Sequence, residues 1–285
     1  MKYLFVILAL IVVGPAAAQW GDCIICPLMD PLRFARPNPP IRNITRVVAP
    51  LVNIETPALT RNSRASYCLR NENLVDTIVF HHSGGPSTSS VTDINSGHVE
   101  HVSGRDPWLM TGYHYSINSR YGDGSPQDRA VTARVSAARP FNITGAHVGT
   151  DIFASVSPQT ATLLRQNSSI RCGVRGTTFT TPDDRFNAAG QAKGNYTTVG
   201  VVIIGNYSQR SSSNDDGYAP GRPRYPSAST IDLAGRLACE LQRRHPRITK
   251  IRAHSSFHST ECPGTIAQRL QEIKNSARRF GCTFQ

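Results

Sequence analysis

The stretch Asp76-Thr-Ile-Val-Phe-His-His-Ser83 decides the fold class of this chain. Its β-branched and aromatic residues predict a buried strand, and the Gly84-Gly85-Pro86 that follows predicts a loop at the carboxyl end of that strand. A second run, Val199-Gly-Val-Val-Ile-Ile204, is too apolar to have a face in water. We therefore expect it in the centre of a sheet that is covered on both sides.

Further strands and helices surround these two runs. Short strands are expected at residues 112–117 and 250–253, and helices at about residues 90–102 and 157–166. After Ser227, apolar residues at helical spacing predict an amphipathic helix with a serine N-cap (Ile231, Ala234, Leu237, Ala238 and Leu241). Thr265 is expected to cap a last helix. Because strands alternate with helices, the fold class is α/β.

The first 18 residues have the features of a secretory signal peptide. Lys2 precedes an apolar run from Leu4 to Val13, and Ala16-Ala17-Ala18 provides a small-residue cleavage site. The apolar run is shorter than the roughly 20 residues of a spanning helix, so we expect no membrane anchor. A secreted, extracellular protein is predicted, periplasmic if the source is bacterial.

The remaining chain divides by composition. Residues 19–73 are rich in Pro and Arg and predict an extended N-terminal segment, whereas residues 74–285 predict one main domain. Residues from about 149 to 194 are polar and rich in turn residues, which indicates an insertion in that domain.

Seven cysteines follow the signal peptide, and export predicts that most form disulfides. Since seven is odd, one thiol must be free, pair between chains or have another role. Cys262 stands in Ser259-Thr-Glu-Cys-Pro-Gly264, where Pro and Gly predict a tight turn before a helix. A helix N-terminus favours the thiolate form, so this cysteine is the candidate for a metal ligand.

The formal net charge of +12 predicts attraction to polyanions. Lys and Arg are scattered and no aromatic-interleaved basic motif is present, so we expect no nucleic-acid partner. Anionic cell-wall polymers, bacterial membranes or glycans fit an exported protein better, and a merely soluble basic surface is the alternative.

His81, His254 and Cys262 each follow a predicted strand or lie in the loop beyond one. Side chains at the carboxyl ends of strands can converge at one edge of a sheet, where open α/β sheets bind ligands. Two imidazoles and a thiolate with one open position form the catalytic zinc pattern. Taken singly, a histidine near a strand end is more often structural and an exported cysteine is more often in a disulfide.

Four motifs occur in an order seen in one family: His81-His82-Ser83, Trp108 followed by Gly112-Tyr-His114, Gly145-Ala-His147, and Arg252-Ala-His254 with Thr260-Glu-Cys-Pro263. The chain resembles the zinc N-acetylmuramoyl-L-alanine amidases, which include phage-type amidases and peptidoglycan recognition proteins. The resemblance covers about residues 76–280 outside the insertion. It implies a central mixed β-sheet flanked by helices.

The resemblance also implies site roles, residue by residue. His81, His254 and Cys262 look like the zinc ligands, which leaves His82 to packing or an outer position. Tyr113 matches a tyrosine near the water that attacks the substrate, and Thr260 matches a position that can donate to the oxyanion. His147 is expected to contact substrate, with a structural loop histidine as the equal alternative.

The predicted function is that of a secreted zinc hydrolase, an antibacterial or wall-degrading enzyme acting as a monomer. It would cleave the amide bond between N-acetylmuramic acid and L-alanine in bacterial peptidoglycan. One alternative is a peptidoglycan-binding recognition protein of the same fold without activity. Another is a polyanion-binding, disulfide-rich protein in which Cys262 is bridged.

Overall fold

The computed structural model describes residues 49–100, 108–118, 133–149, 151–174, 178–209 and 223–285. The predicted signal peptide and residues 19–48 with Cys23 and Cys26 lie outside the described residues, as does Gly122-Asp-Gly124, whose glycines predict a turn. Ala49–Gln285 forms one compact unit. Residues 49–73, which composition grouped with the N-terminal segment, therefore pack with the main domain.

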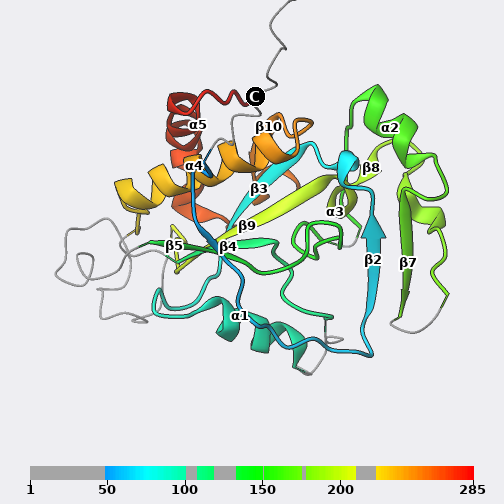
Figure 1. The fold of residues 1–285 in the computed structure, drawn as a ribbon, viewed down its shortest axis with the longest axis horizontal. Helices are drawn as coiled ribbons and strands as arrows, with labels where there is room; N and C mark the ends of the chain where they lie inside the picture. The colour runs from blue at the N-terminus through cyan, green and yellow to red at the C-terminus, as the bar shows by residue number, and fades with distance from the viewer. Residues whose placement is uncertain (1–48, 101–107, 119–132, 150, 175–177, 210–222) are drawn as a thin grey trace, which may run out of the picture. The chain divides into compact units, whose positions relative to one another are not determined.

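A six-stranded mixed sheet forms the centre of the domain (Figure 1). Every neighbouring pair is parallel except β4 and β5, which are antiparallel. This confirms the predicted α/β class and mixed sheet. The strands, in spatial order, are β1 (Ile54–Glu55), β5 (Arg134–Ala137), β4 (Tyr115–Asn118), β9 (Thr198–Ile204), β3 (Thr77–His82) and β10 (Lys250–Ala253).

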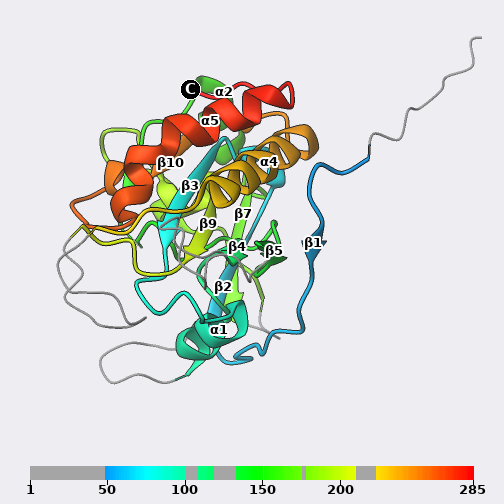
Figure 2. The same cartoon turned by 90° about the vertical axis from the view of Figure 1, so that its left-hand side faces the viewer.

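Strand β9 lies between β4 and β3, and all its residues are buried, as its apolar sequence predicted. Helices α4 (Ala228–Arg244) and α5 (Leu270–Arg279) cover one face of the sheet, and α1 (Val91–Val99) lies on the other side (Figures 1 and 2). The core between sheet and helices is built from alternate residues of the strands, including Ile78, Phe80, Val201 and Ile203, with Leu237, Leu241 and Ile273.

Serine side chains cap the helices α4 and α1. Ser227, where the sequence predicted an N-cap, accepts a hydrogen bond from the backbone N–H of Thr230, and Ser90 forms a capping box with Asp93 at the start of α1. The prediction for Thr265 is wrong. This residue lies inside a 3₁₀ helix, η4 (Gly264–Arg269), where its N–H donates to the carbonyl of Tyr207 at 2.8 Å, and α5 begins only at Leu270.

The predicted insertion contains short elements of its own. Strand β7 (Ile170–Val174) pairs with β2 (Ser66–Arg70) in an antiparallel two-stranded sheet, and a disulfide joins Cys68 to Cys172 across it. The other elements of this region are α2 (Pro158–Leu164), α3 (Gly194–Thr197), β6 (Phe153–Ala154), β8 (Ala192–Lys193) and η2 (Asp183–Arg185). A single 3₁₀ turn, η1 (Glu72–Leu74), leads from β2 towards β3.

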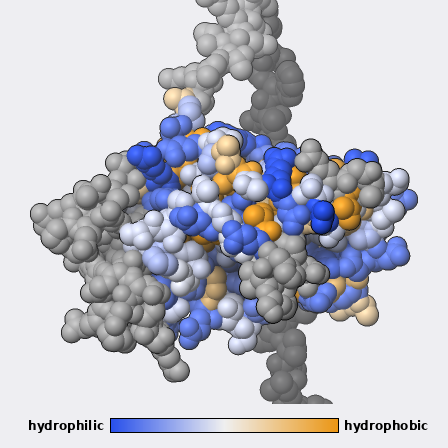
Figure 3. All heavy atoms as spheres, turned by 90° about the horizontal axis from the view of Figure 1, so that it is seen from below, coloured by the Kyte–Doolittle hydropathy of each residue, from blue (hydrophilic) through white to orange (hydrophobic). Residues whose placement is uncertain are grey.

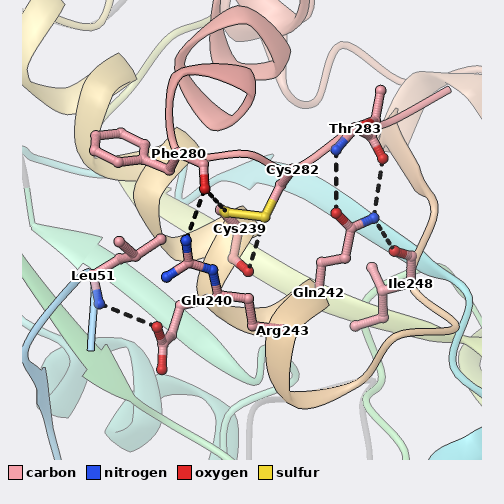
Figure 4. The surroundings of a disulfide bond; sticks show 9 residues. All are labelled: Leu51, Cys239, Glu240, Gln242, Arg243, Ile248, Phe280, Cys282 and Thr283. Atoms are coloured by element: carbon pink, nitrogen blue, oxygen red, sulfur yellow. Dashed lines mark hydrogen bonds between the residues drawn. A yellow bond between two sulfur atoms is a disulfide. The ribbon is translucent and has the colours of Figure 1, made fainter. Parts of the chain in front are cut away.

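A second disulfide, between Cys239 and Cys282, ties α4 to the segment after α5 (Figure 4). Around it, Arg243 donates to the carbonyl of Phe280 at 2.8 Å, and Gln242 donates to the carbonyls of Ile248 and Thr283. Among the described cysteines, Cys262 alone is free. The thiol nominated from the sequence is therefore in neither of these two disulfides.

The described part of the surface exposes few large apolar side chains. The face seen in Figure 3 carries scattered apolar spots among hydrophilic side chains. Over the described ranges, Tyr225 is the one large hydrophobic residue classed as exposed. None of the helices in that part of the chain has the length and apolar character needed to cross a membrane.

Candidate metal centre

Parallel pairing of β3 and β10 brings two histidines together. The register aligns Phe80 with Ala253, so the next residues, His81 and His254, lie side by side where the strands end. The ring centroids of these two histidines are 4.5 Å apart. Cys262 joins them from the loop after the short turn η3 (His254–Ser256), and the potential ligand atoms of all three residues lie within 4.8 Å of one another.

Strand alternation separates His81 from His82. His81 is fully buried, and its Nδ1 lies 3.6 Å from Sγ of Cys262. His82 turns the other way, and its Nδ1 accepts a hydrogen bond from the backbone N–H of Tyr207 at 3.0 Å. The backbone N–H of His82 donates to Sγ of Cys262 at 3.4 Å. His82 therefore supports the sulfur through its main chain, while its imidazole lies outside the cluster.

The donor atoms suit a divalent metal ion of the zinc type. Nδ1 of His254 is buried and has no hydrogen-bond partner among the described residues, a costly state for a polar atom unless a ligand meets it. Burial lowers the pKa of His81 well below its usual value and that of His254 to about 4, so both imidazoles are neutral near pH 7. Neutral imidazole and cysteine sulfur are ligands that zinc accepts readily.

The thiol of Cys262 differs from the sequence expectation. Burial raises its pKa to about 11, although the hydrogen bond from the backbone of His82 opposes this. No α-helix N-terminus stabilises a thiolate here, because α5 begins eight residues later at Leu270. A thiolate at this position therefore needs a positive charge beside it, which a bound metal ion would supply.

Tyr113 and Thr260 lie around the cluster. The ring centroid of Tyr113 is 5.0 Å from that of His81, and burial together with the nearby Cys262 raises the pKa of its phenol, which keeps its proton. The hydroxyl of Thr260 is half-buried and accepts a hydrogen bond from the backbone N–H of Cys262 at 3.2 Å. Its own proton is left to donate elsewhere.

His147 lies behind the cluster and is only 5% exposed. Its Nδ1 is 3.0 Å from Nε2 of His81, and its Nε2 is 3.2 Å from Oγ1 of Thr198. Both ring nitrogens thus have protein partners. Contact of this side chain with substrate stays a prediction, as does the alternative of a structural role.

His258 was missed by sequence reasoning. Its Nε2 lies 2.8 Å from Nε2 of His254. The signal was present, since His258 stands four residues from both His254 and Cys262 in a short loop. Two other histidines, His98 and His101, lie in the helix predicted at about residues 90–102, where a solvated or structural role is expected. The ring centroid of His98 is 4.6 Å from that of Trp108, and His101 lies outside the described residues.

Comparison with known proteins places the chain in a family. The profile of the N-acetylmuramoyl-L-alanine amidases matches residues 71–265, and the chain belongs to this family. No curated protein sequence matches the chain.

Solved structures similar to this one include an amidase, an endolysin and a recognition protein. The amidase LysC from Clostridium intestinale URNW is 17% identical, with a TM-score of 0.41 over 78% of this chain and 98% of that one. The endolysin of Thermus scotoductus MAT2119 bacteriophage Ph2119 is 19% identical, with a TM-score of 0.40 over 71% and 84%. Drosophila peptidoglycan recognition protein SD is 15% identical, with a TM-score of 0.41 over 78% and 94%.

Proposed function

We propose that the chain is a secreted, zinc-dependent hydrolase that cleaves the amide bond between N-acetylmuramic acid and L-alanine in bacterial peptidoglycan. The observation that carries this proposal is the cluster of His81, His254 and Cys262 at the strand ends of an amidase-family domain. The Cys68–Cys172 and Cys239–Cys282 disulfides support an oxidising, extracellular location.

The three clustered side chains would hold the metal ion and leave one coordination position open, as catalytic zinc sites do. When bound, zinc polarises an amide carbonyl and makes water nucleophilic near neutral pH. The chain's own residues then position the reactants. The backbone N–H of His82 fixes the sulfur of Cys262, and the burial of His81 keeps bulk water away from its imidazole.

Tyr113 and Thr260 are the residues we assign to the reaction. Tyr113 keeps its phenol proton and lies beside His81, so it can orient the attacking water by a hydrogen bond. Thr260 is held by the backbone of Cys262 with its hydroxyl proton free to donate to the developing oxyanion. Removal of such a preorganised donor costs on the order of 100-fold or more in rate.

The test combines metal analysis with product analysis. Purified protein should contain one zinc ion per chain and should release peptides with a free L-alanine amino group from peptidoglycan. A chelator, Cys262→Ser and His254→Ala should each abolish the release. His245→Ala is the matched control, because this histidine stacks on Phe141 at 3.8 Å, away from the cluster, and should leave the activity unchanged.

Three results would contradict the proposal in different ways. New glycan reducing ends would show that a glycosidic bond is cleaved. Binding of peptidoglycan without any product would favour a recognition protein of the same fold. A chain without zinc, with Cys262 in a disulfide, would remove the metal site itself.

A further inference from the structure

We propose that His147 and His258 are positioning residues that hold the two histidine ligands with their Nδ1 lone pairs towards the metal. This inference rests on the zinc site of the proposed function. Neither residue touches the metal in this arrangement. Each acts through the Nε2 atom of a ligand, and the hydrogen bonds of the described residues determine which nitrogen carries the proton.

The proton positions around His81 follow from one carbonyl group. The carbonyl of Gly194 can only accept, so the hydroxyl of Thr198, at 2.8 Å, donates to it. The oxygen of that hydroxyl then accepts from the ring of His147, whose Nε2 lies 3.2 Å away. Nε2 of His147 therefore carries the proton, and Nδ1 of this neutral imidazole has a lone pair.

That lone pair fixes the tautomer of His81. Nε2 of His81 lies 3.0 Å from Nδ1 of His147, so Nε2 is the donor and carries the proton. Nδ1 of His81 is left with its lone pair, 3.6 Å from Sγ of Cys262. A metal ligand needs this form, because a protonated ring nitrogen cannot bind a metal ion.

Contacts with neighbouring residues hold the ring of His147 in the orientation that this hydrogen-bond chain needs. It packs directly on Gly200 of β9, where a Cβ atom would lie 2.6 Å from Cγ of His147. The side-chain oxygen of Asn195 accepts from the backbone N–H groups of His147 and Val148 at 3.2 and 3.0 Å. The ring of His147 is therefore held by β9, and its main chain is held by α3.

His258 gives His254 the same support. Nδ1 of His258 lies 3.3 Å from the carbonyl of Ser259, which can only accept, so Nδ1 carries the proton. Nε2 of His258 then accepts from Nε2 of His254 at 2.8 Å, and the lone pair of His254 falls on Nδ1, its buried atom without a partner. This support is weaker, since His258 is only half-buried and its own anchor is a long hydrogen bond.

Metal-binding histidines usually donate their second N–H to a carboxylate, a carbonyl or water, and loss of that partner typically costs 10- to 100-fold in metal affinity. Here the partners are two neutral imidazoles. We expect the larger effect at His147, which is buried and anchored on both sides, and a smaller effect at His258.

The experiment measures zinc affinity of the full chain by competition with a chelator. His147→Phe cannot accept a hydrogen bond and should lower the affinity 10- to 100-fold. His147→Asn places an amide oxygen near the position of Nδ1 and should keep the affinity within a few-fold of the unchanged protein. His258→Phe should lower it by up to about 10-fold.

Two further variants separate positioning from folding. His114→Asn is the control, because His114 is buried beside His147 at a ring distance of 5.7 Å but makes no hydrogen bond to His81 among the described contacts. It should reduce thermal stability without changing zinc affinity. If His147→Phe does not fold, Thr198→Val removes the hydroxyl that orders His147 and should itself lower zinc affinity about 10-fold.

Nitrogen NMR of the histidine rings in the zinc-loaded protein should show Nδ1 of His81 and of His254 bound to the metal. Binding through Nε2 of either ring, or a folded His147→Phe with unchanged affinity, overturns the inference. These outcomes differ from failure of the proposed function. A protein that binds zinc through both Nδ1 atoms but releases no peptide refutes the amidase and leaves the positioning roles intact.

Discussion

Gly264→Ala tests how the turn after Cys262 supports the site. Gly264 has a φ of +63°, which costs an alanine about 1–2 kcal/mol. An added Cβ would lie 2.5 Å from the carbonyl carbon of Tyr207 and closer still to its oxygen, whereas real Cβ atoms essentially never approach within 3.0 Å. The chain must therefore move. The hydrogen bond from the N–H of Thr265 to that carbonyl, 2.8 Å long, would then be lost for a further 1–3 kcal/mol or so.

Gly281→Ala is the matched control. Its φ is +86°, but nothing lies within 4 Å of the added Cβ, so it carries the conformational cost alone. We expect urea unfolding to show a loss of about 3 kcal/mol or more for Gly264→Ala and about 1–2 kcal/mol for Gly281→Ala. Since Cys262 lies two residues before Gly264, zinc affinity should fall at least about 10-fold in the first variant only. Equal losses of stability with unchanged zinc affinity would refute the reasoning.

Three other predictions concern the stability of the domain that holds the site. Replacing both Cys239 and Cys282 with Ala opens a loop with a separation of 43 residues and should lower the free energy of unfolding by about 4 kcal/mol; a loss below about 1 kcal/mol in urea would contradict the chain-entropy argument. Arg139→Met removes the guanidinium that donates to the carbonyls of three residues (Met110, Thr111 and Thr144), and it should lower the free energy of unfolding in urea by about 3 kcal/mol. An unchanged urea midpoint would show that water replaces the guanidinium as the donor. Burial lowers the pKa of His82 to about 4, so the stability that the neutral imidazole contributes is complete above pH 6.5. This stability is lost as the pH falls from 6.5 to 4, by up to about 1.4 kcal/mol per pH unit. A metal-free protein that is equally stable at pH 7 and pH 5 would show that this imidazole is not desolvated.

The two central strands could be predicted because they are buried on both faces. Their β-branched and apolar residues predict strands at 76–81 and 199–204, and the structure has Thr77–His82 and Thr198–Ile204 with every residue buried. The short strand predicted at 250–253 is present as Lys250–Ala253, an edge strand in which Arg252 is exposed. Strand β1 and strand β5 had no such signal. Both are short: β1 is an edge strand of two residues, and β5 lies between it and β4. β1 pairs only with β5, which is far away in the sequence.

The candidate site could be predicted in part, because some of its residues are marked by local sequence patterns. The spacing of His254 and Cys262 is local, and the position of His81 at a strand end is visible in the sequence. The contacts of His147 are not visible, because its partners come from β3 and β9, far away in the chain. The start of the last helix was misplaced for the same reason, since Tyr207, a distant residue, receives the N–H of Thr265.

Gly200 connects the strand that sets the fold to the site that it carries. A glycine inside a strand weakens the strand and leaves a side-chain position empty. Here the empty position is filled by the ring of His147, and the backbone N–H of the same glycine donates to Nδ1 of His114 at 3.1 Å. The apolar residues on either side, Val199 and Val201, keep the strand in the core. The same seven-residue strand therefore supplies the hydrophobic centre of the sheet and the glycine position on which the buried ring of His147 packs while it contacts His81.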